Sequence, residues 1–425
     1  MSAPPSVHIA SAVVPVVGPP MVEGAVAVAG GSIVDVGPAQ TIVEHYPDAE
    51  VLSWQGVLLP GLVNAHTHLQ YSSFASVGST GYPSYISWSE RFVSEYEARR
   101  HDDWQESARS GLEAGLASGT TAFADIVTDV PALGVLMAAD VAGVAYLELI
   151  GVDHEAWRSR VRERTIEVIR SAPVTADTSV GLSPHAPYSV DLPVLIEATA
   201  LARQLGVRIH SHLAESDTED DYYRRGRGAL AERVTLRVGR PWSILAHGGV
   251  GVGAAEFARS CGLLGSDSHV AHGVYLGSEG RKILRSESTY VALCPRSNLT
   301  VGIDPPPVAD FLREGNLIAV GTDSLGSSSS LDLLEDLALL HQLAREGGYR
   351  DADLASRLLE AATMGGAGAL GLQSRIGSLE RGKRADLAIF DLDPDLDGIE
   401  DRIVISGPGR CQATVVAGET RHRAG

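Results

Sequence analysis

Two histidines stand one residue apart in NAHTH, at His66 and His68, directly after the apolar run VLLPGLV. In an extended strand, side chains two residues apart point to the same face, so both imidazoles would lie on one side. Two imidazoles on one face can bind one metal ion. An HxH pair alone is weak evidence for a metal site, so the remaining ligands must come from other parts of the chain.

Four further segments place chemically active side chains in or directly after an apolar run. SPHAPY contains His185, HSHLAE contains His210, His212 and Glu215, VAHGVY contains His272, and GTDS contains Asp323. Imidazoles and carboxylates are metal ligands and also transfer protons near neutral pH. Five apolar runs therefore end on residue types suited to metal-assisted or acid–base chemistry, and this agreement between segments is stronger evidence than any single motif.

The elements that must position these residues alternate along the chain. Eight apolar runs of β type lie at residues 57–66, 120–127, 144–151, 179–186, 207–214, 268–276, 289–295 and 317–324, and helical stretches between them include 103–118, 154–171, 191–206 and 332–346. Continuous apolar runs are typical of parallel strands that are buried on both faces. The pattern predicts an α/β fold, a (β/α)8 TIM barrel, whose functional residues lie at the C-terminal ends of the strands.

The two ends of the chain have a different pattern from the middle. Residues 1–58 and 375–425 contain short runs rich in Val, broken by Gly and Pro, as in AVAVAGGSIVDVGP. Such runs predict small antiparallel strands. We therefore expect residues 1–58 and 375–425 to form one small β-sandwich domain, and residues 59–374 to form the barrel.

Composition excludes several classes of partner. The chain has 425 residues, a formal net charge of −19 and three cysteines, and no run of 18 apolar residues. A strongly acidic chain does not favour nucleic acid or an anionic membrane, which need basic patches. We expect a cytoplasmic protein with a small-molecule substrate and no nucleic-acid or membrane partner. A homodimer is compatible with the sequence, although no interface is visible in it.

Taken together, the motifs resemble those of the amidohydrolase superfamily. PGLVNAHTHL, SPHAPYS, HSHLAES, VAHGVYL, CPRSNL and GTDS follow one another in the order of that superfamily, and IGSLERGKRADLAIFDLD resembles its C-terminal β-sandwich. The resemblance implies that His66, His68, His212 and Asp323 bind metal and that His272 lies beside the water on that metal.

Lysine usage bears on the number of metals. Binuclear members of this superfamily commonly bridge two metals with a carbamylated lysine at strand four, but this chain has only Lys282 and Lys383, and neither ends a predicted strand. His185 occupies the end of the fourth run instead. We therefore expect one divalent metal ion, Zn²⁺ or alternatively Fe²⁺, with an open position for water.

The HxxE spacing from His212 to Glu215 resembles the mononuclear deaminase branch. That likeness implies that Glu215 carries a proton to a ring nitrogen of an aminated heterocycle. Asp323 would accept a proton from the attacking water, and His272 would orient it. The expected reaction is hydrolysis of a cyclic amidine with release of ammonia.

The substrate is less closely defined. NAHTHLQYSS followed by a helix with Trp88 resembles deaminases acting on aminofutalosine, an adenine nucleoside of menaquinone biosynthesis, and those acting on cytosine, guanine or S-adenosylhomocysteine. Gln70 could hydrogen-bond a ring edge, and the aromatic segment 71–96 could stack on the ring or pack a lid. His185 is a substrate contact or a structural group. Arg296 holds a substrate carboxylate or pairs with a structural acid.

Three other readings stay open at this point. A cyclic-amide ring hydrolase like imidazolonepropionase would use the same metal without releasing ammonia, and a chlorohydrolase would release chloride. A catalytically dead barrel that binds a partner is the third, although such a site usually loses ligands.

Overall fold

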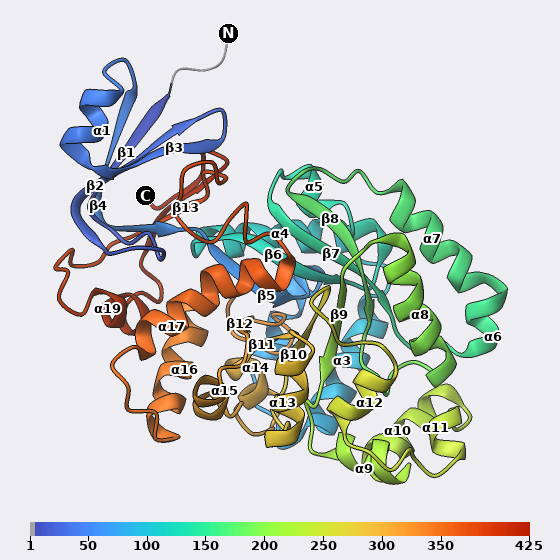
Figure 1. The fold of residues 1–425 in the computed structure, drawn as a ribbon. Helices are drawn as coiled ribbons and strands as arrows, with labels where there is room; N and C mark the ends of the chain where they lie inside the picture. Colours follow the sequence, from blue (N-terminus) through green and yellow to red (C-terminus); the bar gives the residue numbers. More distant parts are fainter. Residues whose placement is uncertain (1–4) are drawn as a thin grey trace.

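A computed structural model describes residues 5–425 and contains an eight-stranded parallel sheet in the order β12-β11-β10-β9-β8-β7-β6-β5 (Figure 1). Its strands are β5 (Leu62–Thr67), β6 (Thr120–Val127), β7 (Ala142–Leu149), β8 (Thr178–Pro184), β9 (Ile209–Leu213), β10 (Ser268–His272), β11 (Tyr290–Leu293) and β12 (Ile318–Val320). The two end strands meet where the Asp323 amide donates to the His66 carbonyl at 3.0 Å. The sheet is thus a nearly closed barrel, and the predicted TIM-barrel architecture is confirmed.

One predicted strand is in fact two. The apolar run at 57–66 divides between β4 (Glu50–Pro60), which belongs to a second sheet, and β5 of the barrel. Gly61 lies at the division, where a Cβ atom would clash with the side chain of Thr121. Both strands are buried around this point, so hydropathy does not change between them and cannot show the boundary.

The second sheet is built from both ends of the chain (Figure 1). It contains seven strands in the order β15-β14-β13-β4-β1-β2-β3, with β1 (Ser6–Val13), β2 (Met21–Ala29), β3 (Ser32–Pro38), β13 (Leu387–Phe390), β14 (Cys411–Val416) and β15 (Glu419–Arg423). Val13 and Ile33 share one apolar core with Leu387 and Val415. A bridge between Ser32 and Arg384 brings the edge of the sheet round to the C-terminal segment. The predicted β domain from both termini is confirmed as this curled mixed sheet.

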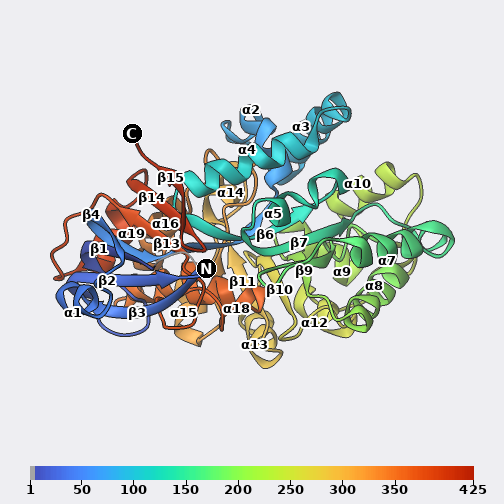
Figure 2. The same ribbon diagram turned by 90° about the horizontal axis from the view of Figure 1, so that it is seen from above.

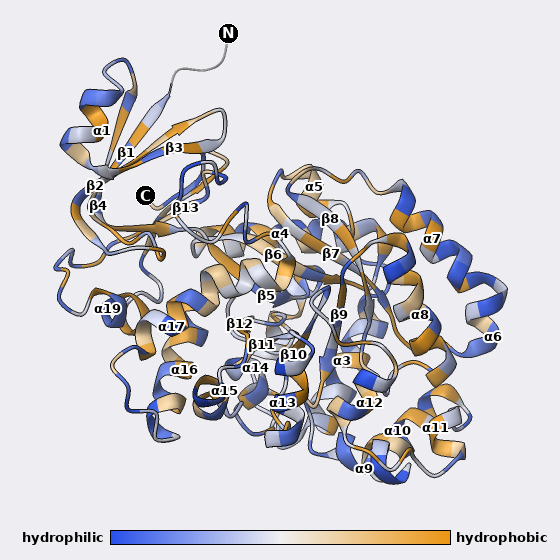
Figure 3. Ribbon diagram, viewed as in Figure 1, coloured by the Kyte–Doolittle hydropathy of each residue, from blue (hydrophilic) through white to orange (hydrophobic). Residues whose placement is uncertain are grey.

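Helices surround the barrel, as the view from above shows (Figure 2). They are α2 (Ala75–Gly78), α3 (Tyr85–Arg99), α4 (Trp104–Ala117), α5 (Val135–Ala138), α6 (His154–Ala156), α7 (Arg162–Ser171), α8 (Leu192–Leu205), α9 (Thr218–Arg225), α10 (Ala229–Val238), α11 (Ser243–Ala246), α12 (Ala254–Ser260), α13 (Ser278–Ser286), α14 (Pro295–Thr300), α15 (Val308–Glu314), α16 (Leu333–Glu346), α17 (Leu354–Glu360) and α18 (Gly366–Leu370). Two helices lie elsewhere: α1 (Ala39–His45) packs on β1, β2 and β3 of the second sheet, and α19 (Ile399–Ser406) packs on α16 and α17. Hydrophobic and hydrophilic stretches alternate along α7 and α8, as expected for helices with one face on the barrel (Figure 3). Among residues 5–425 no helix has both the length and the apolar character needed to cross a membrane.

Aspartate caps explain why three of the predicted helices begin where they do. Asp103, Asp191 and Asp332 each accept a hydrogen bond from a backbone amide in the first turn of α4, α8 and α16. An Asp at the N-cap satisfies an amide that has no partner within the helix. The predicted helix at 154–171 is also present, as α6 and α7 joined through a π-helical turn at Trp157–Val161.

Candidate active site

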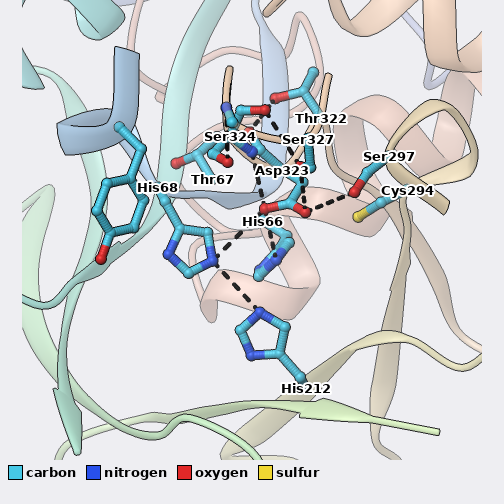
Figure 4. A network of polar contacts seen from close by, with 12 residues as sticks. His66, Thr67, His68, His212, Cys294, Ser297, Thr322, Asp323, Ser324 and Ser327 are labelled. Carbon is cyan, nitrogen blue, oxygen red and sulfur yellow. Dashed lines mark hydrogen bonds and ion pairs between the residues drawn. The ribbon is translucent and has the colours of Figure 1, made fainter. Parts of the chain in front are cut away.

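The four predicted metal ligands, His66, His68, His212 and Asp323, meet at the C-terminal ends of β5, β9 and β12 (Figure 4). Nε2 of His66 and Nε2 of His68 each lie 3.6 Å from Oδ1 of Asp323. Nε2 of His68 lies 3.4 Å from Nε2 of His212. All four side chains are buried. Residues separated by more than 250 positions in the sequence therefore face a single point.

The backbone around this point is closely packed and locally strained. A Cβ atom at Gly321 would lie 2.7 Å from Cβ of His66, so only glycine lets the end of β12 approach β5 this closely. Asp323, His272 and Ala214 have positive φ angles of 58°, 72° and 51°. Such conformations cost non-glycine residues of order 1–3 kcal/mol each and occur mostly at functional sites. The strain here turns the chain at the ends of the strands that carry the candidate ligands.

A chain of hydrogen bonds fixes which imidazole nitrogens face the site. Nδ1 of His210 donates to the His269 carbonyl at 3.1 Å, so Nε2 of His210 is the acceptor for Nδ1 of His66 at 2.8 Å. Nδ1 of His212 donates to the His185 carbonyl at 2.7 Å. The Nε2 atoms of His66 and His212 consequently carry no proton and present their lone pairs to the same point.

The donor set fits a divalent metal ion. Nε2 of His66 is buried and has no hydrogen-bond partner in the described residues, which is rare for buried polar atoms. Burial lowers the pKa of His212 to about 3 and that of His68 well below its usual range, so both imidazoles are neutral. Neutral imidazoles with one carboxylate are ligands for zinc and are also suited to iron. The ligand atoms of His66, His68 and Asp323 lie within 4.8 Å of one another.

Asp323 is ionised in this environment. Burial raises the pKa of its carboxyl, but charge interaction with His66 and His68, whenever these imidazoles carry a proton, outweighs burial and holds the pKa well below its usual range. The hydroxyls of Ser297 and Ser327 each donate to Oδ2 at 2.7 Å. Oδ2 is therefore occupied by the two serines, and Oδ1 is the oxygen that faces the histidines. The sequence motifs did not single out either serine.

The environment of Glu215 shifts its pKa in the opposite direction from that of Asp323. Glu215 is buried, and burial together with the charge of Asp323 raises its pKa well above the usual range. Its Oε1 lies 3.7 Å from Nε2 of His272. Nδ1 of His272 accepts from the Asn298 amide at 3.0 Å, so the proton of His272 is on Nε2. Two side chains that can donate a proton or a hydrogen bond thus border the candidate metal site.

Glu219 is a further residue at the site that the sequence reasoning missed. Its Oε1 accepts from the amides of Glu215 at 2.7 Å and Ser216 at 3.1 Å, and its Oε2 accepts from the amide of Ala214 at 2.9 Å. The carboxyl therefore clamps the three-residue segment that carries Glu215. The signal was present in the sequence, because Ser216 and Glu219 have the S-x-x-E spacing of a capping box.

A cavity of about 220 Å³ is lined at its base by three of the four candidate ligands, His68, His212 and Asp323. Aromatic side chains supply much of its wall, namely Tyr71, Tyr85, Trp88, Phe92, Tyr96, Tyr188 and Trp242. Nε1 of Trp88 donates to the Gly326 carbonyl at 2.9 Å, which ties α3 to the loop after β12. His185 also lines the cavity and stacks on His212 with ring centroids 4.4 Å apart. The aromatic segment is thus a covering helix and a cavity wall together.

Gln70 lies outside this cavity, which corrects the expectation that it contacts a substrate ring. Nε2 of Gln70 donates to Oδ2 of Asp129 at 2.9 Å. Oε1 accepts from the amides of Thr128 at 3.0 Å and Asp129 at 3.1 Å. The buried carboxamide is thus occupied by the turn after β6, which it holds in place.

Arg296 also lies away from the cavity, which corrects the expectation of a contact with a substrate carboxylate. Its guanidinium pairs with Asp336 at 2.7 Å and with Glu335, and it donates to Oγ of Ser330 at 2.8 Å. Its side chain is 12% exposed, and that of Asp336 is fully buried. Arg296 thus forms a structural ion pair between α14 and α16, the second of the two alternatives for this residue.

Comparison with known proteins decides the family. The sequence profile of the Amidohydrolase family matches residues 57–421, which is most of the chain. This chain belongs to the amidohydrolase family. A shorter match, to an imidazolonepropionase-like composite domain of bacteria, covers residues 24–49 of this amidohydrolase, in the sheet built from the termini.

Curated relatives of this amidohydrolase are named as deaminases. The chain is 31% identical to 5-methylthioadenosine/S-adenosylhomocysteine deaminase of Haloarcula marismortui over 84% of this chain and 78% of that protein. It is 30% identical to the protein of the same name in Moorella thermoacetica, over 95% of this chain and 90% of that protein. The prediction of a hydrolase that acts on carbon–nitrogen bonds other than peptide bonds is confirmed by these relatives.

Solved structures agree with the fold of this amidohydrolase. An adenosine deaminase from Xanthomonas campestris with bound zinc has a TM-score of 0.80 and 25% identity, over 98% of this chain and 92% of that one. Aminofutalosine deaminase from Helicobacter pylori has a TM-score of 0.85 and 22% identity, over 98% and 100% of the two chains. Zinc is bound in the Xanthomonas campestris structure, and in this chain His66, His68 and Asp323 form a cluster of donor types that zinc accepts.

Proposed function

We propose that this amidohydrolase is a metal-dependent deaminase that removes the exocyclic amino group of an adenine nucleoside and releases ammonia. The observation that carries the proposal is the position of the buried Glu215 carboxyl beside the His/Asp cluster at the base of an aromatic cavity, where burial raises its pKa. The names of the relatives at 30–31% identity support an adenine nucleoside as the substrate class. Within this class our first candidate is aminofutalosine, followed by 5-methylthioadenosine and S-adenosylhomocysteine.

The proposed site holds one metal ion, Zn²⁺ or Fe²⁺, through His66, His68, His212 and Asp323. When bound, a divalent metal lowers the pKa of a water molecule towards about 7 and so makes it a nucleophile. The fourth-strand end carries His185 rather than a lysine, and Lys383 is occupied elsewhere by Ser378 at 2.6 Å. These observations support a single metal.

The protein's own groups then move the protons. Asp323 accepts a proton from the attacking water at Oδ1, the oxygen that faces the cluster. Glu215 delivers its proton to the ring nitrogen next to the carbon under attack, and Nε2–H of His272 donates to the oxygen that adds to that carbon. Asp323 passes its proton to the departing amino group, which leaves as ammonia, and Glu215 recovers a proton from the new hydroxyl. General acid–base steps of this kind contribute typically about 10²- to 10⁴-fold.

The cavity wall suits a flat ring. Tyr85, Trp88 and Phe92 lie on α3 and face the cavity. Aromatic side chains stack on planar heterocycles and exclude water from the space around them. His185, which stacks on His212 and lines the cavity, is placed to contact the ring edge, and we retain it and Trp88 as proposed substrate contacts.

Ammonia release from metal-loaded protein tests the proposal. The panel contains aminofutalosine, 5-methylthioadenosine, S-adenosylhomocysteine, adenosine, guanine and cytosine. Release from a nucleoside with the matching hypoxanthine product supports it. Imidazolones and chlorinated triazines complete the panel, since ring opening without ammonia, or chloride release, would favour the other amidohydrolase reactions instead.

Glu215→Gln tests the proton donor within the same assay. We expect kcat to fall about 10²- to 10⁴-fold while the metal content stays unchanged, because the amide cannot deliver a proton. Glu232→Gln, an exposed acid on α10, is the matched control and should keep the wild-type kcat. A Glu215→Gln enzyme with wild-type kcat and bound metal would remove Glu215 from the mechanism.

A further inference from the structure

Helix α10 forms one wall of the cavity, and the side that faces the cavity carries two arginines. The residues of α10 that line the cavity follow the repeat of a single helix face, namely Leu230, Arg233, Val234, Arg237 and Val238. Leu236, which is not among them, is 85% exposed. A helix that only closed an apolar cavity would turn its leucines inwards and leave its arginines in water. The two arginines therefore mark this wall as suited to something other than an apolar group.

Arg237 lies where the cavity reaches the surface. The residue is exposed and also lines the cavity, whereas the candidate metal ligands at the base are buried. Its guanidinium forms no ion pair and no hydrogen bond within residues 5–425. Its charge acts on His185, which lines the same cavity and whose pKa it lowers further after burial and the neighbouring histidines. Arg237 is thus a cation that a bound molecule can reach, and no acid of the described residues is paired with it.

Arg233 lies one turn earlier on the same face and is only partly compensated. Its Nη2 donates to Oγ of Ser89 on α3 at 2.7 Å, so the two helices are joined at the cavity wall. Its Nη1 lies 3.6 Å from Oε1 of Glu90, whose side chain is 68% exposed. An ion pair this long and this exposed to water contributes little. The charge of Arg233 therefore remains available to a second anion.

The acids of the cavity do not neutralise these arginines. Oδ1 of Asp323 faces the histidines. Burial raises the pKa of Glu148, on the cavity wall, to about 7, and that of Glu215 well above its usual range. The cavity thus has a candidate metal site at its base and two cations nearer its opening, in a chain whose formal net charge is −19.

We propose that Arg233 and Arg237 form a subsite for an anionic group of the substrate, a carboxylate or a phosphate joined to the ribose of an adenine nucleoside. The inference deepens the proposed function and rests on it, because it assumes a nucleoside whose base lies at the candidate metal site. The guanidinium group presents a planar fork of N–H donors that matches both carboxylate and phosphate oxygens. Among the candidate substrates, aminofutalosine and S-adenosylhomocysteine carry a carboxylate, and 5-methylthioadenosine does not.

Kinetics with charged and neutral nucleosides test the subsite. We compare kcat/KM of the metal-loaded wild type, Arg237→Gln and the double variant Arg233→Gln/Arg237→Gln. S-adenosylhomocysteine supplies a carboxylate, adenosine 5′-monophosphate supplies a phosphate, and adenosine and 5-methylthioadenosine supply neither. Each lost charge-assisted contact should lower kcat/KM for the anionic substrate about tenfold, and the neutral nucleosides should be affected far less. The anion whose turnover depends on the arginines identifies the group that the subsite takes.

Two further variants separate recognition of the anion from general effects of charge. Arg240→Gln removes a positive charge just beyond α10 from a residue that does not line the cavity, and it should keep the wild-type preference for the anionic substrate. Arg237→Lys keeps the charge at the subsite and should restore most of the preference that Arg237→Gln loses. Should the double variant fail to fold, Arg237→Gln alone carries the test, because it breaks no ion pair of the described residues.

An equal loss for charged and neutral nucleosides, or wild-type values in the double variant, would overturn the subsite. Calorimetric binding of the same nucleosides separates this result from a failure of the proposed function. If the wild type releases no ammonia from any nucleoside, the proposed function is wrong. Tighter binding of an anionic than of a neutral nucleoside, lost in the double variant, would still support the subsite in that case. If no nucleoside binds to the wild type, both are wrong.

Discussion

Replacing Glu219 should impair catalysis, although this residue is not a candidate metal ligand and does not line the cavity. Its carboxyl accepts three backbone hydrogen bonds, from residues 214 to 216, and one of these restrains Ala214 at a φ of 51°. In Glu219→Gln the side-chain carbonyl oxygen can replace only one of the two carboxylate oxygens. The side-chain NH₂ group then faces the backbone N–H group or groups that donated to the other oxygen. At least one buried donor then loses its partner, at a cost of about 1–3 kcal/mol.

The segment should then relax and move the side chain of Glu215. A misplacement of about 1 Å can cost about 10²-fold in rate, so we expect kcat of Glu219→Gln to fall between tenfold and 10²-fold. Urea unfolding measures the loss of stability, and steady-state ammonia release with metal analysis measures the loss of kcat at constant metal content. Glu232→Gln again serves as the control. Wild-type kcat in a folded, metal-loaded Glu219→Gln enzyme would refute the argument that this carboxyl positions Glu215.

Three further predictions follow from buried side chains. His210→Phe removes the acceptor for Nδ1 of His66 and should weaken metal binding about 10- to 100-fold, measured as metal retained after dialysis against a graded chelator; unchanged retention would contradict it. Burial lowers the pKa of His8 from 6.5 to about 4, so the folded state resists protonation. The stability contributed by His8 is therefore complete above pH 6.5 and is lost as pH falls towards 4, by up to about 3 kcal/mol. His8→Gln should flatten that part of the stability profile in urea unfolding, and an unchanged slope would be the contrary result. Arg296→Gln should lower the free energy of unfolding by about 3–5 kcal/mol because it leaves buried Asp336 unpaired, while KM stays unchanged; a raised KM at full stability would restore a substrate role.

The parts of the site that could be predicted share one feature, which is that strand register determines them. His66, His68, His212 and Asp323 each follow an apolar run, and the C-terminal ends of parallel strands meet at one end of a barrel. The helix starts were equally accessible, since an aspartate marks each of α4, α8 and α16. Local sequence is sufficient wherever geometry follows from the regular repeat of a strand or a helix.

The residues that could not be placed depend on partners far away in the chain. Gln70 is occupied by Asp129, and Arg296 by Asp336, which lies 40 positions away. Neither contact leaves a mark in the local sequence, so both side chains seemed available for a substrate.

Metal titration during turnover tests the central claim most directly. The protein is stripped with a chelator, zinc is added back in fractions of an equivalent, and ammonia release from the best nucleoside of the panel is followed together with formation of the hypoxanthine product. The account predicts no activity without metal, a linear rise that ends at one equivalent per chain, and equal amounts of ammonia and product. Full activity in the stripped protein, or a rise that continues to two equivalents, would contradict a mononuclear site built from His66, His68, His212 and Asp323.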